Sequence, residues 1–108
     1  MTGIVGVPGD RSDELIEEAA RTAARGFGRV VIKEDEDPRG RRPGEVAEIM
    51  RRVVNDEAPW LECSTVLGEE DALRRELKRL GPDEIVVVFY DQREPLARVL
   101  EEFRAEPV

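Results

Sequence analysis

The chain has 108 residues, a length that suits a single domain. Its formal net charge of −8 argues against general binding to nucleic acids or to anionic membranes, because both need a basic protein face. The lack of histidine and the single cysteine, Cys63, exclude a zinc site, a Ser-His-Asp triad and an intrachain disulfide within one chain.

Two further features point to a cytoplasmic protein. No apolar run approaches the length of a membrane span, and the N-terminus does not have the pattern of a signal peptide. A lone cysteine is also typical of the reducing cytosol. We therefore expect a cytoplasmic domain that has neither a nucleic acid nor a membrane as its partner.

The N-terminal stretch predicts a strand, a turn and a helix. Residues 4–7 are apolar and rich in β-branched side chains, which predicts a short strand. Pro8 and Gly9 turn the chain, and Ser12 can cap a helix over residues 12–25. Such a turn binds anions in many α/β proteins, because free backbone N–H groups converge at the helix N-terminus. The same pattern also fits an ordinary corner between a strand and a helix.

Three more strand–helix units follow. Apolar runs predict strands over residues 29–33, 61–67 and 85–90, and helical spacing predicts helices over residues 44–55, residues 69–80 and from Pro95 onward. The run at 85–90 is the most apolar of the chain and predicts a strand buried on both faces. The run at 61–67 alternates, which predicts an edge strand, and Trp60 is expected to pack at that edge.

These units predict an α/β fold. Alternating strands and helices favour a parallel sheet with right-handed crossovers, here a three-layer α/β/α sandwich. The strand order 3-2-1-4, the Rossmann-like half, puts the alternating third strand at an edge. It also creates a topological switch point between the first and fourth strands, where ligands bind beyond the carboxyl ends. The loops at residues 8–12, 34–43 and 91–94 emerge at that end.

These loops are charged but contain no recognisable catalytic motif. The chain lacks Gly-x-x-x-x-Gly-Lys-[Ser/Thr], so it has no triphosphate cradle of its own, and we assign no catalytic residue and no metal ligand. Residues 34–42 read Glu-Asp-Glu-Asp-Pro-Arg-Gly-Arg-Arg. This order suits a zwitterion, with its amine at the acids and its carboxylate at a guanidinium. The acids also suit Mg²⁺, and a third alternative is a solvated loop whose halves pair with each other.

Three separated motifs carry a family resemblance. They are Val-Pro-Gly-Asp-Arg-Ser-Asp-Glu (residues 7–14), Glu-Asp-Glu-Asp-Pro-Arg-Gly-Arg-Arg-Pro-Gly-Glu (residues 34–45) and Pro-Asp-Glu-Ile-Val-Val-Val-Phe-Tyr (residues 82–90). Together they resemble the C-terminal domain of the Mur ligase superfamily, and especially the C-terminal part of cyanophycin synthetases. The resemblance implies ATP-dependent amide-bond formation through an acyl phosphate. A middle domain holds ATP and Mg²⁺ on its P-loop, and the C-terminal domain closes over it and positions the nucleotide and the amino acid.

The resemblance also implies roles for two groups of residues. The turn after the first strand would face the nucleotide, through Gly9, Asp10, Arg11 and Ser12. Residues 37–39 match the Asp-Pro-Arg of the amino-acid-binding motif of peptidoglycan ligases, and residues 39–41 match the Arg-Gly-Arg of cyanophycin synthetases. The candidate substrate-binding residues are therefore Asp35, Asp37, Arg39, Arg41 and Arg42.

Two functions fit these observations. Residues 1–108 lack the family's P-loop domain, its interdomain hinge and the first two strands of its six-stranded C-terminal domain, so we expect a single trimmed domain with no ligase activity alone. It would bind an amino acid or a nucleotide anion and work in trans with a P-loop ligase partner that supplies ATP and Mg²⁺. The alternative is a non-catalytic interaction domain. The uncharged fourth strand predicts a homodimer, formed by antiparallel pairing of the fourth strands or by burial of the last helix against its mate, unless that helix folds back over the edge.

Overall fold

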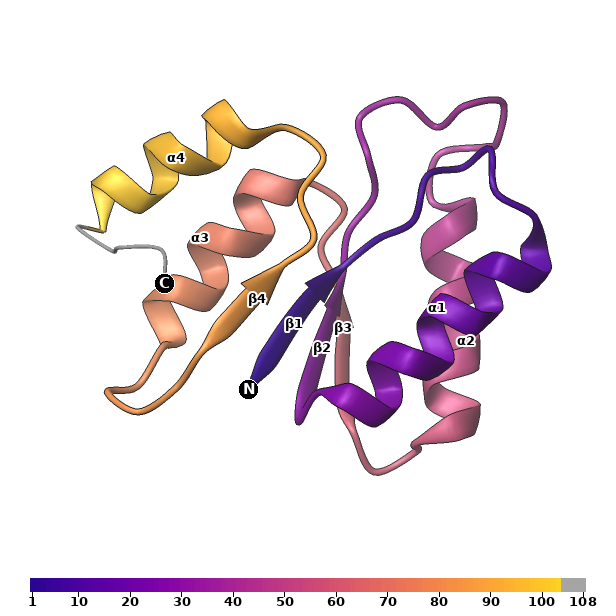
Figure 1. Ribbon diagram of the computed structural model, residues 1–108, viewed down its shortest axis with the longest axis horizontal. Helices are drawn as coiled ribbons and strands as arrows, with labels where there is room; N and C mark the ends of the chain where they lie inside the picture. The colour runs from indigo at the N-terminus through magenta and orange to yellow at the C-terminus, as the bar shows by residue number, and fades with distance from the viewer. Residues whose placement is uncertain (104–108) are drawn as a thin grey trace.

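Four strands and four helices alternate along the chain in the computed structural model, which describes residues 1–103 (Figure 1). The strands are β1 (Thr2–Val5), β2 (Arg29–Ile32), β3 (Glu62–Thr65) and β4 (Val86–Val88). The helices are α1 (Asp13–Gly26), α2 (Glu45–Glu57), α3 (Glu69–Arg79) and α4 (Arg93–Glu102). The predicted order of elements is confirmed, with ends shifted by a residue or two; residues 104–108 of the predicted domain lie outside the described residues. Within residues 1–103, no helix is long and apolar enough to cross a membrane.

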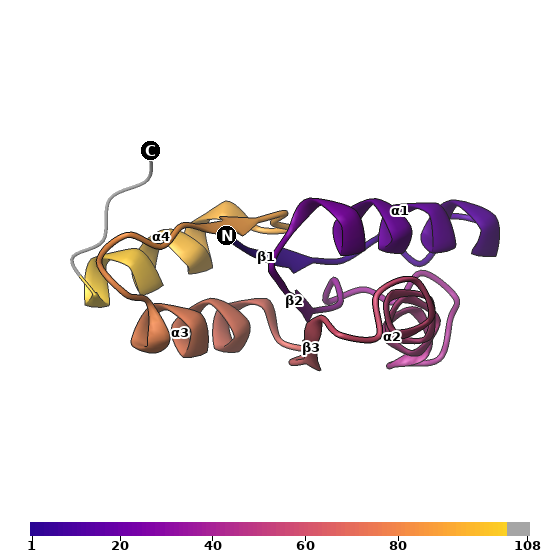
Figure 2. The same cartoon turned by 90° about the horizontal axis from the view of Figure 1, so that it is seen from below.

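The strands form one parallel sheet in the order β3-β2-β1-β4, as predicted. At its centre, Gly3 of β1 lies between Val30 of β2 and Val87 of β4. Helices α1 and α2 cover one face of the sheet, and α3 and α4 cover the other, as Figure 2 shows. The fold is therefore the predicted three-layer α/β/α sandwich with a Rossmann-like strand order.

Each face of the sheet has its own hydrophobic core. Successive side chains of a strand point to opposite faces, so Val5 packs against α1 and α2 while its neighbour Ile4 packs against α3 and α4. Most of the apolar residues at helical spacing are buried or half-buried, whereas Leu15 is exposed. These buried residues include Ile16, Ala20, Ala23 and Ala24 in α1, Val46, Met50 and Val54 in α2, and Leu96 and Val99 in α4.

β4 corrects one prediction. The sequence predicted a strand buried on both faces over residues 85–90, but β4 has three residues and is only half-buried; its position at an edge agrees with the predicted strand order. Val86 and Val88 pack on the α3/α4 core, whereas Ile85 and Phe89 are 54% and 52% exposed. The reason is that α1 and α2 pack on β1, β2 and β3 and leave the same face of β4 uncovered (Figure 1).

Trp60 corrects a second prediction. It was expected to pack at the edge near β3, but it is 81% exposed. The chain makes a tight turn there, in which the Leu61 N–H donates to the Ala58 carbonyl at 3.0 Å. This turn directs Ala58 and Leu61 into the α1/α2 core and leaves Pro59 and Trp60 outside.

Candidate functional site

The candidate site lies at the carboxyl end of the sheet, where the loops after β1, β2 and β4 emerge together as predicted (Figure 1). Two hollows open between these loops. The switch-point hollow has a volume of about 430 Å³ and is lined by Gly6, Pro8, Lys33, Asp35, Arg39, Val88, Phe89, Tyr90 and Asp91. The acidic hollow, of about 490 Å³, lies on the α3 side, and its carboxylates are Glu34, Asp35, Glu36, Glu69, Glu70, Asp71 and Asp91.

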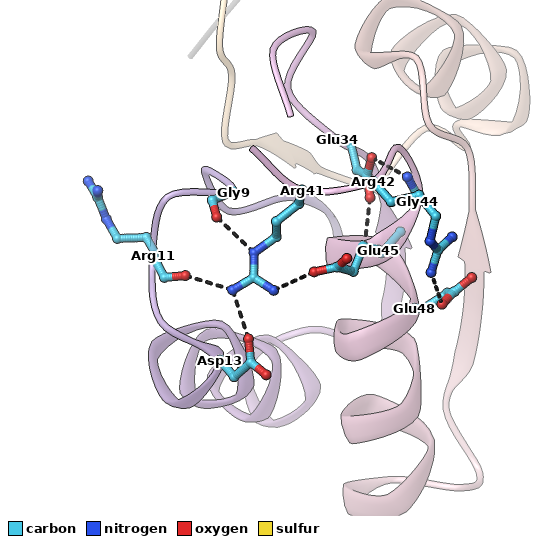
Figure 3. A network of polar contacts seen from close by, with 10 residues as sticks. Gly9, Arg11, Asp13, Glu34, Arg41, Arg42, Gly44, Glu45 and Glu48 are labelled. Carbon is cyan, nitrogen blue, oxygen red and sulfur yellow. Dashed lines mark hydrogen bonds and ion pairs between the residues drawn. The ribbon is translucent and has the colours of Figure 1, made fainter. Parts of the chain in front are cut away.

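Arg41 is fixed by four hydrogen bonds, as Figure 3 shows. Its guanidinium donates to the carbonyl oxygens of Gly9 at 2.8 Å and Arg11 at 2.9 Å. It also donates to the carboxylates of Asp13 and Glu45, at 2.7 Å each. The hydrogen bonds to Asp13 and then Glu45 raise the pKa of Arg41 above its ordinary value. Arg41 therefore clamps the loop after β1 to the first turns of α1 and α2.

Arg42 has a different partner from the other candidate arginines. It pairs with Glu48 of α2 at 3.1 Å, and its side chain is 61% exposed (Figure 3). The hydrogen bond to Glu48 raises the pKa of Arg42. Arg42 does not line the switch-point hollow. The chain reverses direction just before Arg42, so the side chains of Arg39, Arg41 and Arg42 have different surroundings.

That reversal is a tight turn over residues 38–41. The Arg41 N–H donates to the Pro38 carbonyl at 3.1 Å and closes the turn. Both central residues, Arg39 and Gly40, have positive φ angles, of 50° and 90°. A non-glycine residue rarely adopts this conformation, and the Asp37 carboxylate supports it by accepting the Arg39 N–H at 2.9 Å. Asp37 thus positions the backbone of Arg39.

Arg39 is the predicted substrate-binding arginine that lines the switch-point hollow. Its side chain is 46% exposed, and within residues 1–103 its guanidinium contacts one carboxylate, that of Asp10, at 3.4 Å. The rings of Phe89 and Tyr90, more than half exposed, line the same hollow. The hollow therefore combines a lightly paired cation with two aromatic rings.

The predicted nucleotide-facing residues have three different surroundings. Gly9 is buried, and a Cβ atom there would overlap the carbonyl oxygen of Pro38. Asp10 is exposed and pairs with its neighbour Arg11 at 3.0 Å as well as with Arg39. The Ser12 hydroxyl accepts the Leu15 N–H at 3.2 Å, which confirms the predicted cap of α1. Asp10 thus joins the nucleotide-facing group to the substrate-binding group.

Lys33 is a site residue that the sequence analysis missed. It is 1% exposed, and its Nζ atom pairs with Asp35 at 3.0 Å and with Glu69 at 2.8 Å. Its side chain passes beside Gly6, where an added Cβ would lie 3.0 Å from Cε and 2.7 Å from the Lys33 carbonyl oxygen. The available signal was a lysine directly after three β-branched residues and two positions before an acid. This charged cluster separates the two hollows.

Two acids near this cluster, Glu34 and Glu69, have structural roles because they accept backbone N–H groups. Glu34 accepts the N–H groups of Gly44 and Ala47, at 2.8 Å each, and so replaces the missing side-chain cap of α2. Glu69 accepts the Asp91 N–H at 2.6 Å in addition to its pair with Lys33. Within residues 1–103 no group of three His, Cys, Asp or Glu side chains is placed to hold a metal ion.

Comparisons with known proteins agree with part of the resemblance seen in the sequence. No family model matches the chain. It is similar to the cyanophycin synthetases of Synechocystis sp., Crocosphaera subtropica and Geminocystis herdmanii, with 39%, 37% and 36% identity over 87 residues. The matched stretch covers 81% of this chain. It covers about a tenth of the length of each of these curated relatives. The chain is therefore a domain related to a segment of cyanophycin synthetase.

Proposed function

We propose that this domain binds an amino acid or a nucleotide through its anionic group at the switch-point hollow. The proposal rests on the position and backbone conformation of Arg39. Its side chain lines the hollow, and its backbone is held in an uncommon conformation by Asp37. Backbone strain of this kind clusters at active sites and ligand-binding positions. The location also agrees with the rule that α/β sheets bind ligands at the switch point.

The contacts of Arg41 and Arg42 support Arg39 as the ligand-binding arginine. Arg41 is engaged by two carbonyl oxygens and two carboxylates, and Arg42 is paired on α2. The contact between Arg39 and Asp10 is long and exposed, so it contributes little stability and a ligand can displace it at low cost. The planar guanidinium then binds a carboxylate or phosphate through paired hydrogen bonds.

The relation to cyanophycin synthetase supports a wider setting for this module. We propose that it is a C-terminal domain of the Mur ligase type, which acts in trans with a P-loop partner in the cytoplasm. The partner would hold ATP and Mg²⁺, since this chain has no Gly-x-x-x-x-Gly-Lys-[Ser/Thr] motif. In this setting the domain presents an amino acid or a nucleotide to the partner and does not itself form the amide bond.

Titration calorimetry with aspartate, arginine, AMP and Mg-ATP tests the proposed function. The parent chain should bind at least one of them, and Arg39→Ala should raise that dissociation constant about tenfold to a hundredfold, the worth of a charged hydrogen bond. Arg52→Ala is the matched control, because Arg52 is an exposed arginine of α2 that does not line the hollow. Equal affinity of the parent and Arg39→Ala, or no binding by the parent, would refute the proposal.

A further inference from the structure

β4 leaves one edge of the sheet open. The Ile85 carbonyl accepts a hydrogen bond from β1 at 2.9 Å, and the Phe89 N–H donates one to β1 at 3.0 Å. Residues of a parallel strand alternate in this bonding, so the backbone N–H and C=O groups of Val86 and Val88 point to the outer edge. β4 is the last strand of the sheet, and no other strand of the described chain pairs with these groups (Figure 1).

The two edges of the sheet are built differently. At the β3 edge, the exposed side chain of Glu62 pairs with Arg29 at 3.1 Å and Arg79 at 3.4 Å, and Ser64 accepts from Arg75 at 2.9 Å. Soluble proteins protect open edges with such charges, or with proline. Residues 85–90 contain neither a charge nor a proline. The β4 edge is therefore unprotected, in contrast to the β3 edge of the same sheet.

An apolar patch accompanies the open edge. The ring of Phe89 meets that of Phe27 edge-on, with centroids 6.3 Å apart, and Phe27 lies over Gly3 of β1. Ile85 and Tyr90 are also more than half exposed. Half-exposed side chains of this size each leave about 100 Å² accessible, so the patch approaches the few hundred Å² that mark interaction sites.

We propose that two copies of this chain pair their β4 strands antiparallel, about a twofold axis that passes beside Val87. The register follows from the free backbone groups. Val86 of one copy lies opposite Val88 of the other, so that both residues of each copy exchange N–H and C=O bonds. Val87 then faces its own equivalent, and Ile85 faces Phe89 of the second copy. Directly opposed residues point to the same face, so apolar side chains meet apolar side chains throughout.

A second copy fits this edge because the register is self-complementary, as a twofold interface requires. The pairing also limits the assembly to two copies, because the unprotected β4 edge of each described sheet is then paired. Each chain carries a net charge of −8, so the two copies repel each other at long range. Salt screens this repulsion and leaves the apolar contact intact. The dimer is therefore expected to tighten as salt is added, whereas an interface held by ion pairs would loosen.

Sedimentation equilibrium of the full 108-residue chain tests the interface. From about 1 to about 100 µM the parent mass should rise from 12.2 kDa towards twice that value, with a lower dissociation constant in high salt. Val87→Lys and Val87→Glu should each weaken the dimer at least about tenfold, because like charges would face each other on the axis. An equimolar mixture of the two variants should restore the dimer. Arg52→Glu, on exposed α2, is the control and should change nothing.

Several outcomes of this experiment would contradict the proposed dimer. A parent that stays at 12.2 kDa at the highest concentration overturns the proposal, and so do Val87 variants that dimerise as tightly as the parent. Variants that fail to recover on mixing exclude an axis beside Val87. Circular dichroism checks that the variants fold. If they do not fold, Ile85→Lys is the alternative variant, because the Ile85 side chain is already exposed. Ile85→Lys should weaken the dimer. The double variant Ile85→Lys/Phe89→Glu should restore it, because each lysine would then face a glutamate of the other copy. This interface does not depend on ligand binding at Arg39.

Discussion

Arg39 and Arg41 are two positions apart, and the turn between them gives their side chains opposite surroundings. The Arg41 side chain is 17% exposed and bonds to the loop after β1 and to two helices. The Arg39 side chain is 46% exposed and meets a single carboxylate among the described residues, at 3.4 Å. Arg41 therefore has a structural role, whereas ligand binding at Arg39 is our proposal.

Arg41→Ala should lower the melting temperature by several degrees. The substitution leaves the carboxylates of Asp13 and Glu45 and the carbonyl oxygens of Gly9 and Arg11 without their shared donor. Arg41→Lys should recover only part of the loss, because an ammonium cannot reproduce the geometry of a forked guanidinium. Thermal unfolding followed by circular dichroism measures both changes.

Arg42→Ala is the control for this prediction. Arg42 also pairs with a helix carboxylate, but both partners are more than 60% exposed, so the pair should contribute little. Equal melting temperatures for the Arg41→Ala and Arg42→Ala proteins would show that the clamp has no structural importance.

At the scale of elements, the loops after β1 and β2 are packed together at one close approach. Gly9 lies against the carbonyl group of Pro38, and Arg41 bonds to the Gly9 carbonyl from the other loop. The turn that presents Arg39 is thus positioned by the first loop. The orientation of the candidate site depends on this contact between segments about 30 residues apart.

Gly9→Ala should separate these loops and weaken ligand binding as well as stability. The new Cβ would overlap the backbone carbonyl of Pro38, which cannot rotate away as a side chain could. Gly26→Ala is the matched control, because it ends α1 with nothing within 4 Å of the new atom. It should leave the stability unchanged or raise it by up to about 1 kcal/mol. Calorimetric titration and thermal melts of both variants make the comparison, and a Gly9→Ala protein that matches the parent in both would contradict it.

The elements themselves were predictable because their signals are local. Helical spacing in α2 and the runs of β-branched residues in β2 and β4 need no tertiary information. Exposure was less predictable, since it depends on which elements lie beside each other. Residues 85–90 read as a buried strand, but an edge position and an uncovered face leave Ile85 and Phe89 exposed. Trp60 is exposed because a tight turn directs its neighbours inward.

The candidate site was predictable as a region and only partly as a set of side chains. The strand order put the charged loops at one end of the sheet, as found. The turn at residues 38–41 then divides the arginines among three surroundings, which depend on φ angles that the sequence does not specify. Lys33 and Glu69 meet across elements 36 positions apart in the chain, so neither indicated the other in advance.

For the whole molecule, we expect no ATP hydrolysis by the isolated chain. A phosphate-release assay with Mg-ATP should give no turnover, because nothing replaces the P-loop lysine and glycines that cradle the β- and γ-phosphates. Addition of a P-loop ligase partner, with its amino-acid substrate, is the positive arm and should produce turnover that Arg39→Ala reduces. Steady hydrolysis by the pure chain, abolished by Asp10→Asn, would contradict this expectation.

The buried pairing of Lys33 has a consequence for how related sequences diverge. Loss of the Lys33 ammonium would leave the carboxylates of Asp35 and Glu69 without their shared cation, so substitution of Lys33 alone is strongly disfavoured. Gly6 is restricted for another reason, since a Cβ there would approach the carbonyl oxygen of Lys33, which every residue at that position carries. Across a lineage of such domains, position 6 should therefore stay glycine whatever stands at position 33. A lineage that loses the lysine at position 33 should also lose the acids at positions 35 and 69.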